Sequence, residues 1–141
     1  MGDRYQVRIE LSFASGHRLL GHQGKCVHPH GHTYRAEIWM ASEALNSIGF
    51  VVDFTDVKDK VGGWIDEHWD HAFLVSGRDE EMLAALRGVE GSRVFVFPDA
   101  NPSAEVMARE LYRTAEELCG VAPSMVRVWE SPSQYAEYGA V

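Results

Sequence analysis

Two segments near the N-terminus alternate between apolar and polar residues. In residues 5–17 the apolar positions of one parity are Val7, Ile9, Leu11 and Phe13. Residues 32–40 repeat this rhythm with Tyr34, Ala36, Ile38 and Met40. A period of two is typical of a strand with one buried face. The stretch between the segments contains three glycines and a proline, as loops often do, so the pattern predicts a long antiparallel hairpin.

Two later segments follow a helical period instead. The apolar positions of the first are Val57, Val61, Ile65 and Trp69, and its candidate N-caps are Asp53, Thr55 and Asp56. Paired glycines at 62 and 63 weaken this pattern without cancelling it. The second segment, residues 101–120, has Ser103 as its expected cap and Gly120 as its expected end. Its apolar stripe consists of Met107, Ala108, Leu111, Ala115 and Leu118.

The remaining segments are shorter. Residues 76–92 indicate a loop with some helix, and RVFVFP (residues 93–98) indicates a short buried strand. Residues 124–141 indicate a second hairpin, which turns at residues 131–133. The layout predicts an α+β fold: a four-stranded antiparallel sheet of two hairpins with two main helices on one face. A chain of 141 residues suits one domain, residues 1–141.

The charge and composition of the chain indicate which kinds of binding partner to expect. A net charge of -8 argues against nucleic acid and against an anionic membrane surface, because both attract clustered Lys and Arg. No apolar run approaches the length of a membrane span, and the N-terminus has no basic-then-apolar leader pattern. We therefore expect a cytoplasmic protein. The two cysteines, Cys26 and Cys119, are too few for a disulfide framework.

Three histidines are expected to meet at one end of the first hairpin. His30 and His32 have the parity of the apolar positions of their strand, and so does His17 in the other strand. In a hairpin centred near Gly24 these side chains converge on the buried face. Three imidazoles without a fourth protein ligand are typical of catalytic zinc, although copper or nickel is also permitted. The alternative is that each imidazole is a core side chain bonded to a carbonyl group.

Two further groups call for partners. Glu130 shares strand parity with Val126 and Val128, and a carboxylate on a buried face is costly unless it is hydrogen-bonded. The alternative is a strand-end glutamate that turns to solvent. Asp70 and His71 are adjacent, as in catalytic pairs in which a carboxylate orients an imidazole, but a helix-end salt bridge would have the same sequence.

Several short motifs, taken in order along the chain, resemble one family. They are FASGHRL, KCVHPHGHTYR, VVDFTDVK, WDH, NPSAE and WESPSQYAEY. Together they resemble the 6-pyruvoyl-tetrahydropterin synthase / 6-carboxytetrahydropterin synthase family over nearly the whole chain. The short Cys-x-x-x-His-Gly-His spacing is similar to that of the bacterial 6-carboxytetrahydropterin synthases of queuosine biosynthesis. The resemblance implies the tunnelling fold (T-fold) and a homo-oligomer, a hexamer, whose subunits assemble into a barrel.

The resemblance also implies roles for individual residues. The implied zinc ligands are His17, His30 and His32, the trio already chosen from parity. The implied catalytic residues are Cys26, Asp70, His71 and Glu130, and Glu130 also anchors the pterin ring. Among the departures from the family pattern, Ser103 replaces a common threonine. Trp69 stands where leucine is common, and it could alter the pocket shape and hence the substrate.

The implied reaction is that of a zinc-dependent 6-carboxy-5,6,7,8-tetrahydropterin synthase. Its substrate is 7,8-dihydroneopterin triphosphate, and triphosphate and acetaldehyde are released. Cys26 is the expected base, with Lys25 and zinc favouring its thiolate form, and His71 relays protons. Because the chain is acidic, Lys25 as a substrate-binding residue, Arg18, or basic residues of another subunit must offset the charge of the triphosphate.

Three other functions remain as alternatives. A sibling enzyme could form the pyruvoyl product or shorten the side chain for folate synthesis, although folate-type siblings tend to carry glutamate at the position of Cys26. A non-catalytic module stabilised by zinc would have no use for that thiol. A hydratase with histidine ligands would have no role for Glu130.

Overall fold

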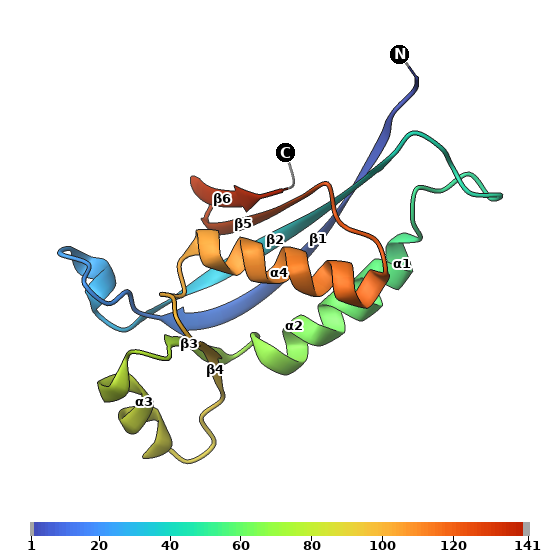
Figure 1. The fold of residues 1–141 in the computed structure, drawn as a ribbon. Coiled ribbons are helices and arrows are strands. Elements are labelled where there is room, and N and C mark those ends of the chain that lie inside the picture. The colour runs from blue at the N-terminus through green and yellow to red at the C-terminus, as the bar shows by residue number, and fades with distance from the viewer. Residues whose placement is uncertain (1, 140–141) are drawn as a thin grey trace.

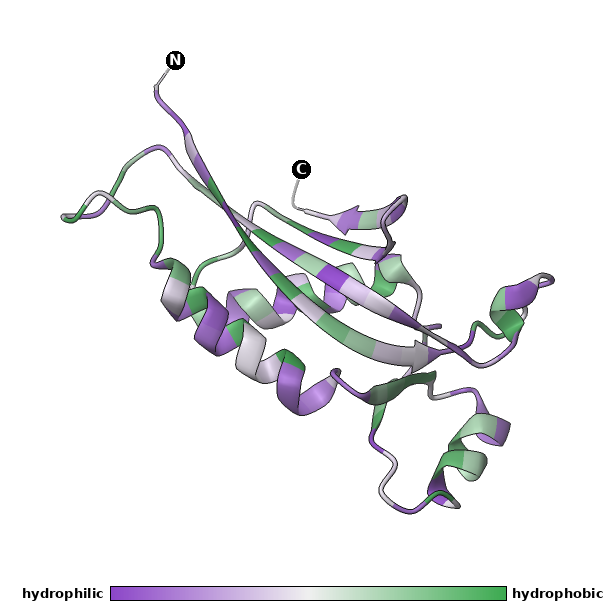
Figure 2. Cartoon of the chain, turned by 180° about the vertical axis from the view of Figure 1, so that it is seen from behind, coloured by the Kyte–Doolittle hydropathy of each residue, from purple (hydrophilic) through white to green (hydrophobic). Residues whose placement is uncertain are grey.

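The structure is a computed structural model that describes residues 2–139. Its centre is a six-stranded sheet with the order β4-β3-β1-β2-β5-β6 (Figure 1). The longest strands, β1 (Tyr5–His17) and β2 (His30–Ser42), form the predicted antiparallel hairpin. They pair without a break from Tyr5↔Ser42 to His17↔His30. The alternation of hydropathy along both strands is visible in Figure 2.

The second predicted hairpin is also present. It consists of β5 (Met125–Ser131) and β6 (Gln134–Tyr138), and β5 runs antiparallel to β2. Val126 and Val128 of β5 are fully buried, so this strand extends the apolar face of the first hairpin. The pairing of β5 with β6 has an irregularity between Trp129 and Ser131, next to the turn.

The sheet has two more strands than predicted, and it is mixed instead of antiparallel. β3 (Ala72–Ser76) pairs in parallel with the end of β1, and β4 (Val94–Phe97) pairs in parallel with β3. The prediction missed β3 because a strand of five residues is too short to show a period. The strand predicted in residues 93–98 exists as β4, but as an edge strand, so Val94 and Val96 are 39% and 41% exposed.

One long helical segment crosses the sheet, as the period predicted. It comprises α1 (Phe54–Val57), a wider π turn at Lys58–Gly62 and α2 (Gly63–His68). The Asp53 side chain caps it by accepting a hydrogen bond from the backbone N–H of Thr55. The paired glycines therefore coincide with a change of helical geometry without ending the helix.

The second main helix, α4 (Ala104–Cys119), follows its predicted limits closely. The Ser103 side chain accepts from the N–H of Val106, and Gly120 ends the helix with a φ of 75°. A third helix, α3 (Glu80–Arg87), lies in the segment expected to be loop with some helix, and it forms the crossover between β3 and β4. Among the described residues, no helix combines the length and apolar character that a membrane span requires.

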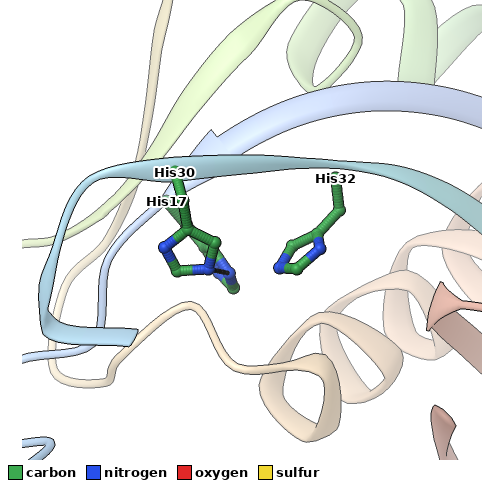
Figure 3. Close-up of side chains that lie close together, drawn as sticks. All are labelled: His17, His30 and His32. Carbon is green, nitrogen blue, oxygen red and sulfur yellow. Dashed lines mark hydrogen bonds between the residues drawn. The ribbon is translucent and has the colours of Figure 1, made fainter. Parts of the chain in front are cut away.

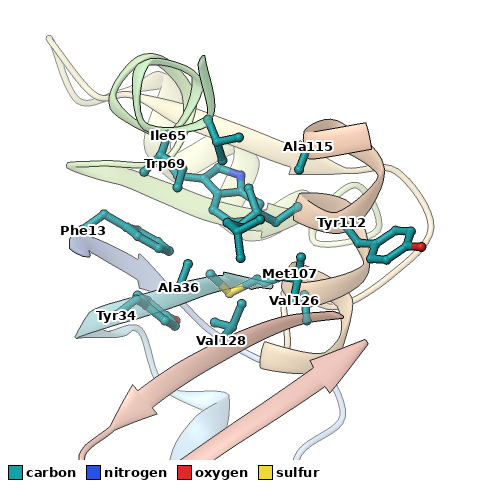
Figure 4. Close-up of a cluster of buried hydrophobic side chains, with 14 of the residues drawn as sticks. Phe13, Tyr34, Ala36, Ile65, Trp69, Met107, Tyr112, Ala115, Val126 and Val128 are labelled. Atoms are coloured by element: carbon teal, nitrogen blue, oxygen red, sulfur yellow. The ribbon is translucent and has the colours of Figure 1, made fainter. Parts of the chain in front are cut away.

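The core lies between one face of the sheet and the two main helices (Figure 4). Phe13 stacks on Tyr34 at a ring-centroid distance of 5.1 Å and also packs against Trp69 at 5.5 Å. Trp69 is fully buried and contacts Phe97 as well. This indole therefore fills the core, and its effect on the shape of a substrate pocket stays a prediction.

Candidate metal centre

Three imidazoles meet at the end of the first hairpin, as the parity argument predicted. His17 ends β1 and pairs directly with His30, the first residue of β2, while His32 lies two residues further on the same face (Figure 3). One nitrogen from each ring can be chosen so that all three lie within 4.8 Å of one another. The Nε2 atoms of His17 and His30 are only 3.1 Å apart.

In His17 and His30, the hydrogen bond of Nδ1 determines whether Nε2, which faces the other rings, carries a proton or a lone pair. His17 Nδ1 donates to the carbonyl oxygen of Pro102 at 2.7 Å, and His30 Nδ1 donates to the carbonyl oxygen of His28 at 2.7 Å. A carbonyl oxygen only accepts, so Nδ1 carries the proton and Nε2 of each neutral ring presents a lone pair. Burial, opposed by the bond to Pro102 and assisted by the charges of His30 and His32, lowers the pKa of His17 to about 4, so His17 is neutral near pH 7.

Two facing lone pairs 3.1 Å apart repel each other unless a cation lies between them. Zinc–nitrogen bonds of 2.0–2.1 Å in a tetrahedral site separate two ligand atoms by roughly 3.3 Å, close to the separation observed here. Metal-binding histidines usually donate the N–H of their other ring nitrogen to a carbonyl or carboxylate group, as His17 and His30 do here. The trio therefore fits a divalent metal, and its all-imidazole donor set suits zinc, copper, iron or nickel.

Glu130 borders the histidine trio. It continues the buried face of β5, and its Oε1 lies 4.0 Å from His17 Nε2. Its charge acts on His32: burial lowers the pKa of His32, whereas Glu130 opposes that shift. Glu130 also lines an open cavity of about 480 Å³ together with Glu105 and Tyr135. The glutamate is thus placed where a ligand could contact both its carboxylate and a metal.

Cys26 lies in the loop of the same hairpin, within a single 3₁₀ turn (Lys25–Val27). Its carbonyl oxygen accepts from the N–H of Leu19 at 2.8 Å, which closes the loop. Burial raises the pKa of Tyr34, and the charges of Glu130 and Cys26 raise it further, so both groups lie within electrostatic reach of one phenol at the metal site. Cys26 is partly buried and is not in a disulfide.

Asp70 and His71 form the expected pair, but they are not joined to Cys26. Asp70 Oδ2 lies 3.0 Å from His71 Nδ1, and Asp70 Oδ1 accepts from the N–H of Ala14 at 2.9 Å. The His71 side chain is 78% exposed. Within residues 2–139 no hydrogen bond or ion pair links this pair to Cys26 or to the histidine trio. His71 and Arg93 line an open cavity of about 720 Å³, and the lining of this cavity also includes His30 and His32.

Arg18 does not serve as a free cation beside the site, which corrects that expectation. Its Nε donates to Asp79 Oδ2 at 2.6 Å, and its Nη1 lies 3.2 Å from Glu81 Oε1. Asp79 is 2% exposed, and the hydrogen bond from Arg18 holds its pKa below the usual value despite burial. Arg18 therefore anchors the start of α3 to the end of β1. Lys25 makes no salt bridge within the described part of the chain and remains a candidate substrate-binding residue.

Two residues with evident roles at the site were missed by the sequence reasoning. The carbonyl of Pro102 orients His17, and the Asn101 side chain both accepts from the Leu20 N–H and donates to the Leu20 carbonyl, at 2.9 Å each. These bonds tie the hairpin loop to the start of α4. Nothing local in the motif NPSAE indicates contacts with residues some 80 positions away.

Comparison with known proteins gives matches over nearly the whole chain. The family model described as 6-pyruvoyl tetrahydropterin synthase matches residues 6–140. A 6-carboxy-5,6,7,8-tetrahydropterin synthase of Rickettsia bellii is 33% identical over 131 residues, covering 90% of this chain and 94% of the relative. One of the same name from Haemophilus influenzae is 32% identical over 139 residues, covering 95% and 98%.

The fold agrees as well. The structure of Caenorhabditis elegans 6-pyruvoyl tetrahydropterin synthase superposes with a TM-score of 0.73 at 19% identity, covering 99% of this chain and 98% of that one. This confirms the predicted T-fold architecture, with a mixed sheet of six strands in place of the expected four. The chain therefore belongs to the 6-pyruvoyl tetrahydropterin synthase family.

Proposed function

We propose that this protein is a zinc-dependent 6-carboxy-5,6,7,8-tetrahydropterin synthase of queuosine biosynthesis. Its substrate would be 7,8-dihydroneopterin triphosphate, and triphosphate and acetaldehyde would be released. The names of its relatives support this reaction. The observation that carries the proposal is the pair of facing imidazole lone pairs beside Glu130 and the loop of Cys26.

The three histidines would hold the metal, and the backbone would hold the histidines. Zinc bound there would supply a Lewis acid that polarises a hydroxyl oxygen of the substrate side chain. The carbonyl groups of Pro102 and His28 keep the protons of His17 and His30 on Nδ1, so that the Nε2 atoms remain available as ligands.

Glu130 would orient the pterin ring. A carboxylate accepts two parallel hydrogen bonds, and the amino group and ring N–H of a pterin offer two parallel donors. Because its Oε1 is 4.0 Å from His17 Nε2, a ring held by Glu130 would direct its side chain toward the histidine trio. A Glu130→Ala variant should therefore lose substrate binding, while an unchanged substrate titration would exclude this role.

Cys26 would act as the base that removes a proton from the substrate side chain, and Lys25 beside it would favour the thiolate and contact the phosphates. The Asp70–His71 pair would relay protons, with Asp70 holding the imidazole. Because no hydrogen bond or ion pair joins this pair to Cys26 within residues 2–139, we propose that the protein works as a homo-oligomer in which a second subunit contributes the pair. The outer edge of β1 supports this idea, since β3 covers it only at Ser15–His17.

Product analysis tests this function. Purified protein loaded with zinc should convert dihydroneopterin triphosphate to 6-carboxytetrahydropterin and acetaldehyde, identified by mass. The pyruvoyl product instead would assign the protein to the sibling activity for which the family model is named. No conversion of any pterin would favour a non-catalytic module.

A cysteine comparison tests the base. Cys26→Ala should keep its zinc and lose turnover by about a hundredfold to ten-thousandfold, the usual cost of removing a general base. Cys119→Ala, in the last turn of α4, is the matched control and should keep turnover. Near-full activity of Cys26→Ala would show that the thiol is not the base.

A further inference from the structure

The turn between α2 and β3 carries an unusual backbone conformation. His71 has a φ of 59°, and among residues 2–139 it is the only non-glycine residue with a positive φ. Such a conformation is unfavourable for a non-glycine residue and persists only where the surrounding structure holds it. The groups that bind this turn therefore determine where the His71 imidazole points.

Arg93, which lies just before β4, binds the turn with its side chain. Its Nη1 donates to the carbonyl oxygen of Asp70 at 2.8 Å. Its Nη2 donates to the carbonyl oxygen of Asp66 at 2.9 Å and also to that of Glu67. These carbonyl groups lie at the end of α2, where a helix leaves its acceptors without internal partners. One guanidinium thus binds three carbonyl groups of the segment that leads into His71.

The peptide group between Asp70 and His71 is held at both of its polar ends. Its carbonyl oxygen, which belongs to Asp70, accepts from Arg93, and its N–H, which belongs to His71, donates to the carbonyl oxygen of Ala14 at 2.7 Å. The φ of His71 is the rotation between this peptide plane and the rest of the residue. Holding the plane at two points therefore sets the direction in which the His71 side chain leaves the backbone.

We propose that Arg93 is a positioning residue for the Asp70–His71 pair, acting through the peptide plane that it holds. The proposal rests on the proposed function, in which His71 relays protons. A planar guanidinium can reach several carbonyl groups at once, whereas the ammonium of lysine is a point charge on a flexible stem. A favourable interaction with the helix end alone would need only a positive charge. The Arg93→Lys variant therefore distinguishes the two roles, because it keeps the positive charge at the helix end and loses the simultaneous bonds to several carbonyl groups.

The first test compares three variants at this and a matched position. Arg93→Ala and Arg93→Lys should both lower kcat by about tenfold to a hundredfold, the usual cost of losing a group that orients a functional side chain, with KM and zinc content unchanged. Arg93→Lys should unfold at nearly the wild-type temperature, because it keeps the charge at the helix end. Arg87→Ala, an exposed arginine at the end of α3, is the control and should keep wild-type kcat. Wild-type kcat in Arg93→Lys would overturn the proposal.

A double-mutant cycle shows whether Arg93 acts through His71. If it does, Arg93→Ala should lower kcat by the tenfold to hundredfold given above when His71 is present. In a His71→Ala background the same substitution should leave kcat almost unchanged. Guanidinium ion at millimolar concentration should restore part of the kcat of Arg93→Ala and none of that of His71→Ala. Independent losses that multiply in the double variant would assign Arg93 a separate role and contradict the proposal.

A readout without activity keeps this proposal distinct from the proposed function. Hydrogen exchange of the peptide spanning residues 66–73 should be faster in Arg93→Lys than in wild type, because the peptide plane that carries the His71 N–H would be held only at its bond to Ala14. Exchange should be unchanged in Arg87→Ala. Unchanged exchange in Arg93→Lys would refute the positioning role even in an active enzyme. Faster exchange in a protein that converts no pterin would support it and refute only the proposed reaction.

Discussion

Acidification of the metal-free protein should weaken its folding through His17. Burial lowers the pKa of this imidazole from 6.5 to about 4 in the folded chain. As pH falls, the unfolded chain therefore binds its proton first, so the contribution of His17 to stability is complete above pH 6.5 and is lost between pH 6.5 and 4. The whole shift corresponds to about 3 kcal/mol, of which about 2 kcal/mol would be lost by pH 5. His32, whose pKa burial also lowers, acts in the same direction.

Urea unfolding after removal of metal by a chelator measures this loss. With an ordinary denaturant slope of 1–3 kcal/mol per molar, the midpoint should fall by about 1 M between pH 7.5 and pH 5. His17→Asn is the matched variant, because an asparagine amide can still donate to the carbonyl oxygen of Pro102 while it does not titrate. Its midpoint should change less with pH than that of wild type.

Two results would refute this reasoning. A wild-type midpoint that stays constant from pH 7.5 to pH 5 would mean that His17 protonates without cost in the folded state. An equal pH dependence in His17→Asn would mean that other groups cause the effect. Added zinc should stabilise the protein at pH 7.5 by mass action and much less at pH 5, because protonated imidazole does not bind metal.

Three further predictions concern the metal, the core and the anchor of α3. His32→Ala should lose stoichiometric zinc in elemental analysis while His22→Ala, in the exposed loop, keeps it, and retained metal in His32→Ala would exclude this ligand. Trp69→Ala should lower the free energy of unfolding by about 3–5 kcal/mol, since the indole is fully buried, and a loss below 1 kcal/mol would contradict its place in the core. Asp79→Asn keeps a capping side chain on α3 but loses the charge that faces Arg18, so it should destabilise the protein by about 2 kcal/mol without releasing zinc. Equal urea midpoints of Asp79→Asn and wild type would show that this ion pair contributes nothing.

Much of the site could be predicted because period-two patterns determine which face a side chain occupies. The apolar positions of β1 and β2 assign His17, His30 and His32 to the buried face, and a hairpin without a break brings His17 opposite His30. Glu130 follows from the same rule, since its strand neighbours of equal parity are fully buried. Helix limits were predictable for a similar reason, because capping by Ser103 and termination at Gly120 are local interactions.

The parallel strands and the Asp70–His71 geometry could not be predicted in this way. β3 is too short to show a period, and its pairing with β1 joins residues 57 positions apart, such as Ser15 and Ala72. Arg18 shows that a position close in the chain can also mislead. Its place next to His17 favoured a role in binding phosphate, yet its guanidinium binds the carboxylate of Asp79. Contacts of this kind join segments that are far apart in the chain. The pattern of hydropathy along the chain does not show which distant segments will meet.

The amino-acid sequence alone determined the hairpins, the two main helices and the convergence of the histidine trio, since each follows from interactions between residues close in the chain or paired across one turn. The tertiary structure decided which nitrogen of His17 carries the proton, because the carbonyl group that orients this ring belongs to Pro102, 85 residues away. It also decided the backbone conformation of His71. The peptide group before this residue is bound by Ala14 of β1 and by Arg93 just before β4. Contacts of this kind arise only when distant segments pack together.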